Sequence, residues 1–271
     1  MLGSLFRPVR VGRLFGIPLL VMPAVLVLTV VILASAPGGG EVGELALLLG
    51  LLAVFLVAHE LGHALVARRL GLKVIDITIW PLGGMARMEG VFDRPQAEAP
   101  VALAGPLVNL GLAGVFALLP GPLAAAATGI NLVLGLGNLV PAFPLDGGRV
   151  LRAWMARRSP MSDATNAAVR IGSWTGVLLV AGAIAIDAFW LGLLLLLYIW
   201  FTGKLELVQV ILRTAQPPTL RPGAVFLRSF RGQAPDQEVH PAAGADRDDP
   251  QIDALENFHG DLDEFFQGRR R

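Results

Sequence analysis

The longest uncharged stretch of the chain, from Pro100 to Leu145, most constrains what it can fold into. About 20 apolar residues cross the hydrocarbon core of a bilayer. The stretch is therefore long enough for two crossings, and "LLPGPL" at 118–123 is the expected turn between them. Composition agrees, because 54% of all residues are hydrophobic and only 16% are charged, with a mean hydropathy of +0.64. The sequence thus predicts a membrane protein with several transmembrane helices.

Four further apolar segments bring the expected number of membrane crossings to six. They are residues 17–35, 45–67, 171–186 and 188–203, and the third of them is expected to begin near Ala164. The first segment also resembles a cleavable signal peptide, because "ASA" follows it at 34–36. It is long for a signal peptide, so we expect a retained helix and keep cleavage as the alternative. The expected fold class is an all-α membrane protein with six transmembrane helices.

The placement of basic residues predicts the orientation in the membrane. Alternate connections carry them: Arg7, Arg10 and Arg13, then Arg68, Arg69, Lys73, Arg87 and Arg94, then Arg149, Arg152, Arg157 and Arg158, and finally Lys204 and Arg213. The other connections, residues 36–44, 118–123 and Asp187, contain no Lys or Arg. Because short loops rich in Lys and Arg stay in the cytoplasm, both termini are expected to be cytoplasmic.

Two segments outside the apolar stretches are polar. Residues 72–90, "LKVIDITIWPLGGMARMEG", alternate apolar and polar and then break at "PLGG", which predicts a small cytoplasmic β-hairpin between helices 2 and 3. Residues 214–271 form a polar, proline-containing tail, in which apolar residues recur at helical spacing between Ile252 and Phe265. We therefore expect a membrane domain over 1–213 and a cytoplasmic tail over 214–271 with one amphipathic helix.

A histidine and glutamate pattern interrupts the second apolar segment. In "AHELGHALVAR", residues 58–68, His59 and His63 are four residues apart and so project from one face of a helix. Glu60 is turned from His59 by about 100°. This HExxH spacing is typical of two zinc ligands with a carboxylate that serves as general base. Ionisable side chains within a span need a partner or a wet cavity, which favours a metal site over simple helix packing.

A third ligand has to lie at a similar depth, and Asp146 is the best candidate. It ends the uncharged stretch, in "NLVPAFPLDGGR" at 138–149. Pro141 and Pro144 are expected to break the helix before it, and irregular backbone at membrane depth lines a cavity or is buried in protein. The other carboxylates are expected on the opposite side or in the polar connection. The alternative is an ordinary helix end in which Asp146 pairs with Arg149.

Three motifs together resemble a known family. "AHELGHALVAR", "ALAGPLVNLGLA" at 102–113 and "NLVPAFPLDGGRVL" at 138–151 are similar, in sequence and order, to the site-2 protease family of intramembrane zinc metalloproteases, peptidase family M50. The resemblance covers roughly residues 10–213 and implies one zinc ion per chain, held by His59, His63 and Asp146 with Glu60 as catalytic base. It also implies an active site reached from the cytoplasmic side. The PDZ and CBS domains of many members are not recognisable, so a short form is expected.

Two asparagines match further family positions. Asn109 closes a "GxxxN" element that begins at Gly105, and Asn138 opens the "NxxPxxxxDG" element. Either amide could contact the substrate or stabilise an oxyanion. Either could equally bond a neighbouring helix, and these alternatives stay open at this point.

The expected function is that of an intramembrane zinc endopeptidase in regulated intramembrane proteolysis, at the bacterial inner membrane. Its expected partners are single-pass membrane protein substrates and the lipid bilayer. A substrate strand could add to the 72–90 hairpin. A net charge of +1 gives no support for nucleic-acid binding, and the absence of cysteine excludes thiolate ligands and cysteine nucleophiles. The alternatives are a non-catalytic homologue that binds membrane segments and, less favoured, a metal transporter.

Overall fold

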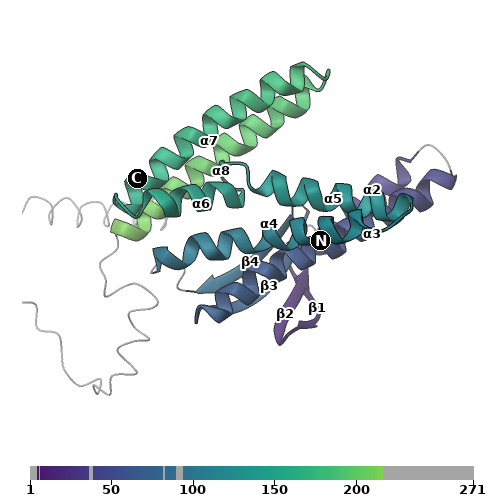
Figure 1. The fold of residues 1–271 in the computed structure, drawn as a ribbon, viewed down its shortest axis with the longest axis horizontal. Coiled ribbons are helices and arrows are strands. Elements are labelled where there is room, and N and C mark those ends of the chain that lie inside the picture. The colour runs from purple at the N-terminus through teal and green to yellow at the C-terminus, as the bar shows by residue number, and fades with distance from the viewer. Residues whose placement is uncertain (1–4, 6, 37–38, 82, 90–93, 216–271) are drawn as a thin grey trace, which may run out of the picture. The chain divides into compact units, whose positions relative to one another are not determined.

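The computed structural model describes residues 5, 7–36, 39–81, 83–89 and 94–215. The tail and its expected amphipathic helix lie outside these residues. The elements follow in the order β1 Val9–Leu14, β2 Ile17–Val21, α2 Pro23–Ala34, α3 Gly39–Arg69, β3 Lys73–Trp80, β4 Gly83–Glu89, α4 Pro95–Ala117, α5 Pro122–Asn138, α6 Asp146–Met155, α7 Met161–Ile184 and α8 Phe189–Ala215 (Figure 1).

Four helices of the described part are long and apolar enough to cross a membrane: α3, α4, α7 and α8. The chain is therefore an integral membrane protein, as expected. Two more apolar helices are shorter, α2 with 12 residues and α5 with 17. Four of the six expected crossings are thus long enough to span a membrane. The other two expected segments contain the shorter helices α2 and α5.

The first expected crossing, residues 17–35, is not one helix but a strand followed by a helix. Residues Ile17–Val21 form strand β2, and the helix begins only at Pro23. The sequence is apolar in both parts, but for different reasons. The strand is apolar because Ile17 packs into a buried cluster with Ala64 of α3 and Ile77 of β3. Hydropathy alone does not distinguish this burial from contact with lipid, so the prediction merged the strand with the helix.

Four strands form one sheet in the order β1-β2-β3-β4. Strand β1 pairs antiparallel with β2, β2 pairs parallel with β3, and β3 pairs antiparallel with β4. The segment expected as a hairpin is the β3–β4 half, with Ile77 opposite Ala86. It is part of a larger sheet because β1 and β2, from the start of the chain, pair with its other edge. Strand β3 therefore has neighbours on both sides, whereas one edge of β4 is free of any strand in the part of the chain that the structure describes.

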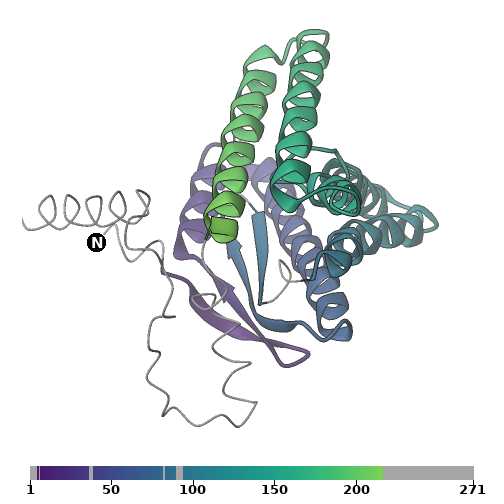
Figure 2. The ribbon, with the colours of Figure 1, turned by 90° about the vertical axis from the view of Figure 1, so that its left-hand side faces the viewer.

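The sheet and the helices meet on α3. The strands lie beside the C-terminal half of α3, and α4 packs along the same helix (Figures 1 and 2). Close approach of α3 and α4 requires Gly62, since a Cβ there would lie 2.9 Å from the carbonyl oxygen of Ala104. Helix α5 packs on α4, the short α6 packs on α4 and α7, and α7 and α8 run side by side. Helix α3 thus stands between the sheet and α4.

The end of α5 leads into the second motif-bearing segment. Helix α5 ends at Asn138, residues 139–145 are irregular, and α6 begins at Asp146. Prolines at 141 and 144 lack the backbone N–H that a continuing helix needs. The break places Asp146 at the first turn of a new helix, which crosses over to α4.

Candidate active site

The histidines and the glutamate of the HExxH pattern lie on α3, on the part covered by α4 and the sheet. His59, Glu60, His63 and Asp146 are all between 3% and 7% exposed. The i to i+4 spacing brings the two imidazole rings together, with ring centroids 4.7 Å apart. Asp146 comes from a distant part of the sequence, at the start of α6. The two predicted motifs therefore meet in one buried site.

Three ligand atoms converge in this site. Nε2 of His59 lies 3.1 Å from Nε2 of His63 and 3.1 Å from Oδ2 of Asp146. The distance from Nε2 of His63 to the same carboxylate oxygen is 3.2 Å. Ligands about 2.0–2.1 Å from a tetrahedral zinc ion are roughly 3.3–3.4 Å from one another. The triangle of atoms is thus close to the size that three zinc ligands require.

Hydrogen bonds on the far side of each ring fix which nitrogen faces this centre. Nδ1 of His63 donates to the carbonyl oxygen of Val101 at 2.7 Å, and Nδ1 of His59 donates to Oδ1 of Asn109. Each neutral ring then carries a lone pair, not a proton, on Nε2. Two lone pairs and a carboxylate pointing at one another repel unless a cation lies between them. The donor set therefore fits a metal ion, and its nitrogen and oxygen ligands suit zinc.

The α4 backbone leaves space for the ligands at one residue. A Cβ added to Gly105 would lie 2.3 Å from Nε2 of His63 and 2.7 Å from Nε2 of His59. Any larger side chain would occupy the place of the ligand atoms. The "GxxxN" element thus has two local functions: Gly105 makes room for both imidazoles, and Asn109, one turn later, holds the ring of His59.

Glu60 is held by the sheet. The backbone N–H of Ala86, in β4, donates to Oε2 of Glu60 at 2.9 Å. A Cβ at Gly84, two residues earlier on the same strand, would lie 2.4 Å from Cγ of Glu60. Glu60 thus lies against β4 at two residues, Gly84 and Ala86. The sequence places Glu60 beside the histidines, but its contact with β4 is a tertiary feature.

A second asparagine, which the sequence analysis did not single out, completes the support of His59. Asn131 of α5 is fully buried and accepts a hydrogen bond at 2.8 Å from Nδ2 of Asn109. Its own Nδ2 donates to the carbonyl oxygen of Ala127 at 2.9 Å. These bonds orient the Asn109 amide so that its oxygen faces His59. The available signal was an amide side chain within the long uncharged and mostly apolar stretch.

The other predicted asparagine lies at the end of α5. Nδ2 of Asn138 donates to the carbonyl oxygen of Leu134, four residues earlier, at 2.8 Å. The side chain is half-buried. No hydrogen bond within the described residues joins Asn138 to His59, His63 or Asp146.

A buried set of two histidines and one aspartate, with a glutamate beside it and apolar helices around it, is the arrangement of a membrane metallopeptidase. Sequence comparison agrees, because the profile of peptidase family M50 matches residues 46–121 and 120–180. The chain belongs to peptidase family M50, which confirms the resemblance seen in its motifs.

Individual relatives lead to the same family. Zinc metalloprotease MJ0392 of Methanocaldococcus jannaschii is 32% identical over 209 residues, which cover 73% of this chain and 60% of that protein. Stage IV sporulation protein FB of Bacillus subtilis is 31% identical over 129 residues, 45% of this chain and 44% of the relative. Overall, the chain spans 24–60% of the length of the curated relatives it matches.

A solved structure is similar in fold. The site-2 protease from Methanocaldococcus jannaschii superposes with a TM-score of 0.55 and 29% sequence identity. The match covers 74% of this chain and 95% of the solved chain.

Proposed function

We propose that this chain is a zinc endopeptidase that cleaves membrane proteins within or at the edge of the bilayer. The observation that carries this proposal is the triangle of His59, His63 and Asp146, with ligand atoms 3.1–3.2 Å apart and Glu60 next to it on the helix. These three residues hold one zinc ion per chain. The relative that is named a zinc metalloprotease supports the choice of metal.

Glu60 acts as the general base and then as the general acid. Zinc, when bound, makes water a stronger acid and polarises a carbonyl group. Glu60 takes a proton from the attacking water and passes it to the amine that leaves. The N–H of Ala86 fixes its Oε2, which leaves Oε1 to accept the proton. Burial of the site keeps bulk water away from the reacting groups.

The two predicted asparagines take different roles in this proposal. Asn109 acts as a positioning residue, because its oxygen accepts the Nδ1 proton of His59 and keeps Nε2 free for the metal. Asn131 orients Asn109 in turn. Asn138 remains our candidate for contact with the substrate backbone or the oxyanion, because it is the last residue of α5 before the irregular segment that ends at Asp146.

The substrate binds as an extended strand on β4. The N–H of Ala86 on the free edge of β4 points at Glu60. Addition of a strand to such an edge is a common mode of peptide recognition. The central strand β3 is not available, since it already has β2 and β4 as neighbours. A helical substrate has to unwind locally before it can pair in this way, which favours cleavage near the end of a transmembrane segment.

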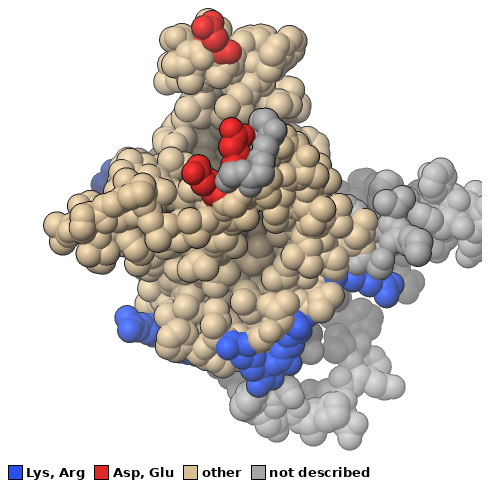
Figure 3. Space-filling model, turned by 90° about the vertical axis from the view of Figure 1, so that its right-hand side faces the viewer, with Lys and Arg blue, Asp and Glu red and all other residues tan. Residues whose placement is uncertain are grey.

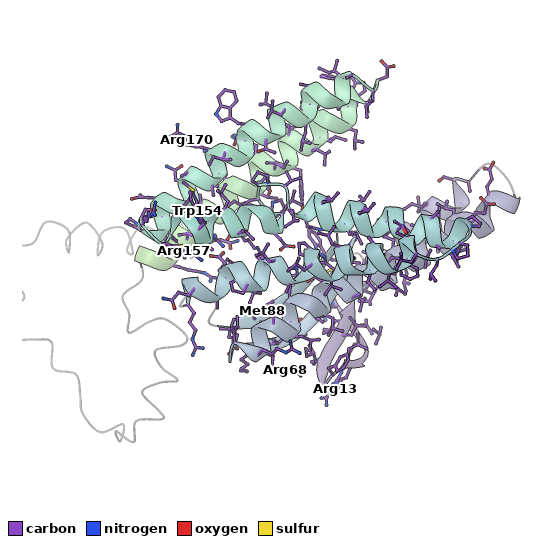
Figure 4. The ribbon with its side chains drawn as sticks, viewed as in Figure 1. Arg13, Arg68, Met88, Trp154, Arg157 and Arg170 are labelled. Atoms are coloured by element: carbon purple, nitrogen blue, oxygen red, sulfur yellow. The ribbon has the colours of Figure 1, made fainter. Side chains whose placement is uncertain are left out.

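The charges support six crossings with cytoplasmic termini, α2 and α5 being the two short ones. Figure 3 shows acidic side chains in the upper half of one face and a basic cluster along its lower edge. In Figure 4, none of the labelled arginines, Arg13, Arg68, Arg157 and Arg170, lies near the right-hand ends of α3, α4 and α5. The labelled arginines thus lie away from these ends, which favours the topology in which the opposite ends of the helices face the cytoplasm.

This orientation gives the biological setting that we propose. The metal site, near the C-terminal end of α3, opens towards the cytoplasm of a bacterial inner membrane. The substrates are single-pass membrane proteins in regulated intramembrane proteolysis. The presence of Glu60 beside a full ligand set disfavours a non-catalytic homologue that only binds membrane segments.

Two measurements test the function. Zinc per chain, measured on detergent-purified protein, should be about one for the native sequence and near zero for Asp146→Ala. The loaded protein is then reconstituted with a bacterial membrane-protein fraction, and new peptide termini are identified by mass spectrometry. Termini that appear with the native protein and not with Glu60→Gln support the proposal. A folded native protein without zinc, or identical termini with both proteins, would contradict it.

A further inference from the structure

The three metal ligands differ in how they are held. The histidines are fixed by second hydrogen bonds, His59 to Asn109 and His63 to the carbonyl oxygen of Val101. Within the described residues, the Asp146 carboxylate lies beside Nε2 of the two histidines and accepts no hydrogen bond from any other group. Its position therefore depends on its backbone, and so on the placement of α6, whose first residue it is.

A single arginine fixes α6 to two other helices. Arg152 is 2% exposed, and its Nε donates to Oε1 of Glu98 in α4 at 2.9 Å. Its Nη2 donates to the same oxygen, and its Nη1 donates to Oε1 of Glu206 in α8 at 2.6 Å. The planar guanidinium thus joins α4, α6 and α8 at one point, and it limits both rotation and sliding of α6.

The irregular segment before Asp146, residues 139–145, also contacts Arg152. The guanidinium carbon of Arg152 lies 5.0 Å from the ring centroid of Phe143, within reach of a cation–π interaction. The hydroxyl of Thr202, one turn before Glu206 on α8, donates to the carbonyl oxygen of Tyr198 at 2.6 Å and lies 3.3 Å from the carbonyl oxygen of Phe143. Both sides of Asp146 along the chain, the irregular segment before it and the helix after it, therefore contact the arginine cluster.

Stability alone is a poor explanation for this buried cluster. It combines one positive and two negative side chains, and replacing a buried ion triad by apolar residues is often neutral or even stabilising. Burial would lower the pKa of the Arg152 guanidinium, but Glu98 and Glu206 outweigh it and hold that pKa above its ordinary value. Arg152 therefore stays charged, and its directional fork of donors defines a geometry that apolar packing would not.

We propose that Arg152 is a positioning residue for the metal site: through Glu98 and Glu206 it holds α6 where Asp146 completes the triangle with the two histidines. The inference rests on the proposed zinc site. Arg152 would hold Asp146 in place as Asn109 holds His59 and the carbonyl of Val101 holds His63.

The decisive variant removes the ion pairs of Arg152 without leaving an unpaired charge buried in the protein. In it, Arg152, Glu98 and Glu206 are all replaced by Met, and the full chain is purified in detergent. Zinc affinity is measured by competition with a chelator, and the visible absorption of the cobalt-loaded protein reports the ligand geometry. We expect the metal-free variant to unfold at a temperature near that of the native protein. Its zinc affinity should fall roughly tenfold or more, as for other outer-shell changes, and its cobalt spectrum should change.

Two further variants make the test specific. Arg152→Lys keeps the charge but loses the fork, so its zinc affinity should also fall. Arg157→Met, an exposed arginine just after α6, should leave affinity and spectrum unchanged. Native affinity in the folded triple variant overturns the proposal, and if that variant does not fold, native affinity in Arg152→Lys overturns it instead. A native protein that binds no zinc refutes the proposed function itself, and the positioning role with it.

Discussion

The backbone N–H of Ala86 donates a hydrogen bond to Oε2 of Glu60 at 2.9 Å, which links the free edge of β4 to the carboxylate beside the metal ligands. This N–H is thus occupied by Glu60, and a substrate strand on β4 would lie next to the carboxylate at this point. Changes in β4 are therefore expected to affect both substrate binding and the position of Glu60, whereas changes in Glu60 alone affect the catalytic step.

Glu60→Gln should strongly slow cleavage without removing the metal. The amide keeps an oxygen that can accept the Ala86 hydrogen bond, but it cannot take a proton from water. A general base contributes about 10²–10⁴-fold to the rate, so turnover should fall by that amount. Turnover and zinc per chain are measured on the same preparation. Loss of zinc together with turnover would show that Glu60 supports the ligands and does not act as base.

Gly105→Ala should remove zinc from a folded protein. The new Cβ would lie 2.3 Å from Nε2 of His63, so the ligand has to move. Gly111→Ala is the matched control, because Gly111 lies on the same helix and a Cβ there meets nothing within 4 Å. Zinc content and thermal unfolding should be native for Gly111→Ala. Native zinc content in Gly105→Ala would contradict the close packing of α4 on the ligands.

Gly84→Ala should give the opposite pattern, with zinc retained and turnover reduced. Its Cβ would lie 2.4 Å from Cγ of Glu60 and at least displaces that side chain, while the histidines face α4. Gly12→Ala, in β1, is the control, since a Cβ at this residue meets nothing within 4 Å. Turnover per bound zinc distinguishes Gly84→Ala, which should lower it, from Gly105→Ala, which should act through the loss of zinc. If it is unchanged in Gly84→Ala, β4 does not determine the position of Glu60.

Asn109→Leu should weaken zinc binding by roughly 10–100-fold, the usual effect of losing an outer-shell partner. Leucine offers no acceptor for the Nδ1 proton of His59, so the ring is no longer held in the tautomer that binds metal. Asn109→Asp keeps the acceptor and should retain more of the affinity than Asn109→Leu. Chelator competition measures both. Equal affinities in the two variants would mean that helix packing, not the hydrogen bond, explains Asn109.

The sequence was most informative where function depends on short-range spacing. His59 and His63 lie four residues apart in one helical segment, so their common face followed from helix geometry alone. Asp146 is distant in sequence, yet the charge pattern left few carboxylates at a suitable depth, and the structure brings it to the histidines. The membrane class followed from long uncharged segments.

Features that depend on tertiary pairing were not predictable in this way. Strand β2 was merged with the following helix, because Ile17–Val21 is apolar for reasons of packing. The parallel pairing of β2 with β3 joins segments more than 50 residues apart, and no local signal gives it. The contacts Glu60–Ala86 and Asn109–Asn131 likewise arise only once strands and helices have assembled.

In the proposed topology of six crossings, the two short helices have a consequence for the lipid around the protein. At about 1.5 Å per residue, α2 and α5, with 12 and 17 residues, extend roughly 18 Å and 26 Å. The hydrocarbon layer is about 30 Å thick, and a mismatch of this kind is relieved partly by thinning of the bilayer, at fractions of a kcal/mol per Å. A transmembrane segment of ordinary length beside either helix would then be too long for its surroundings. Its terminal turn would lose part of the lipid contact that keeps it helical.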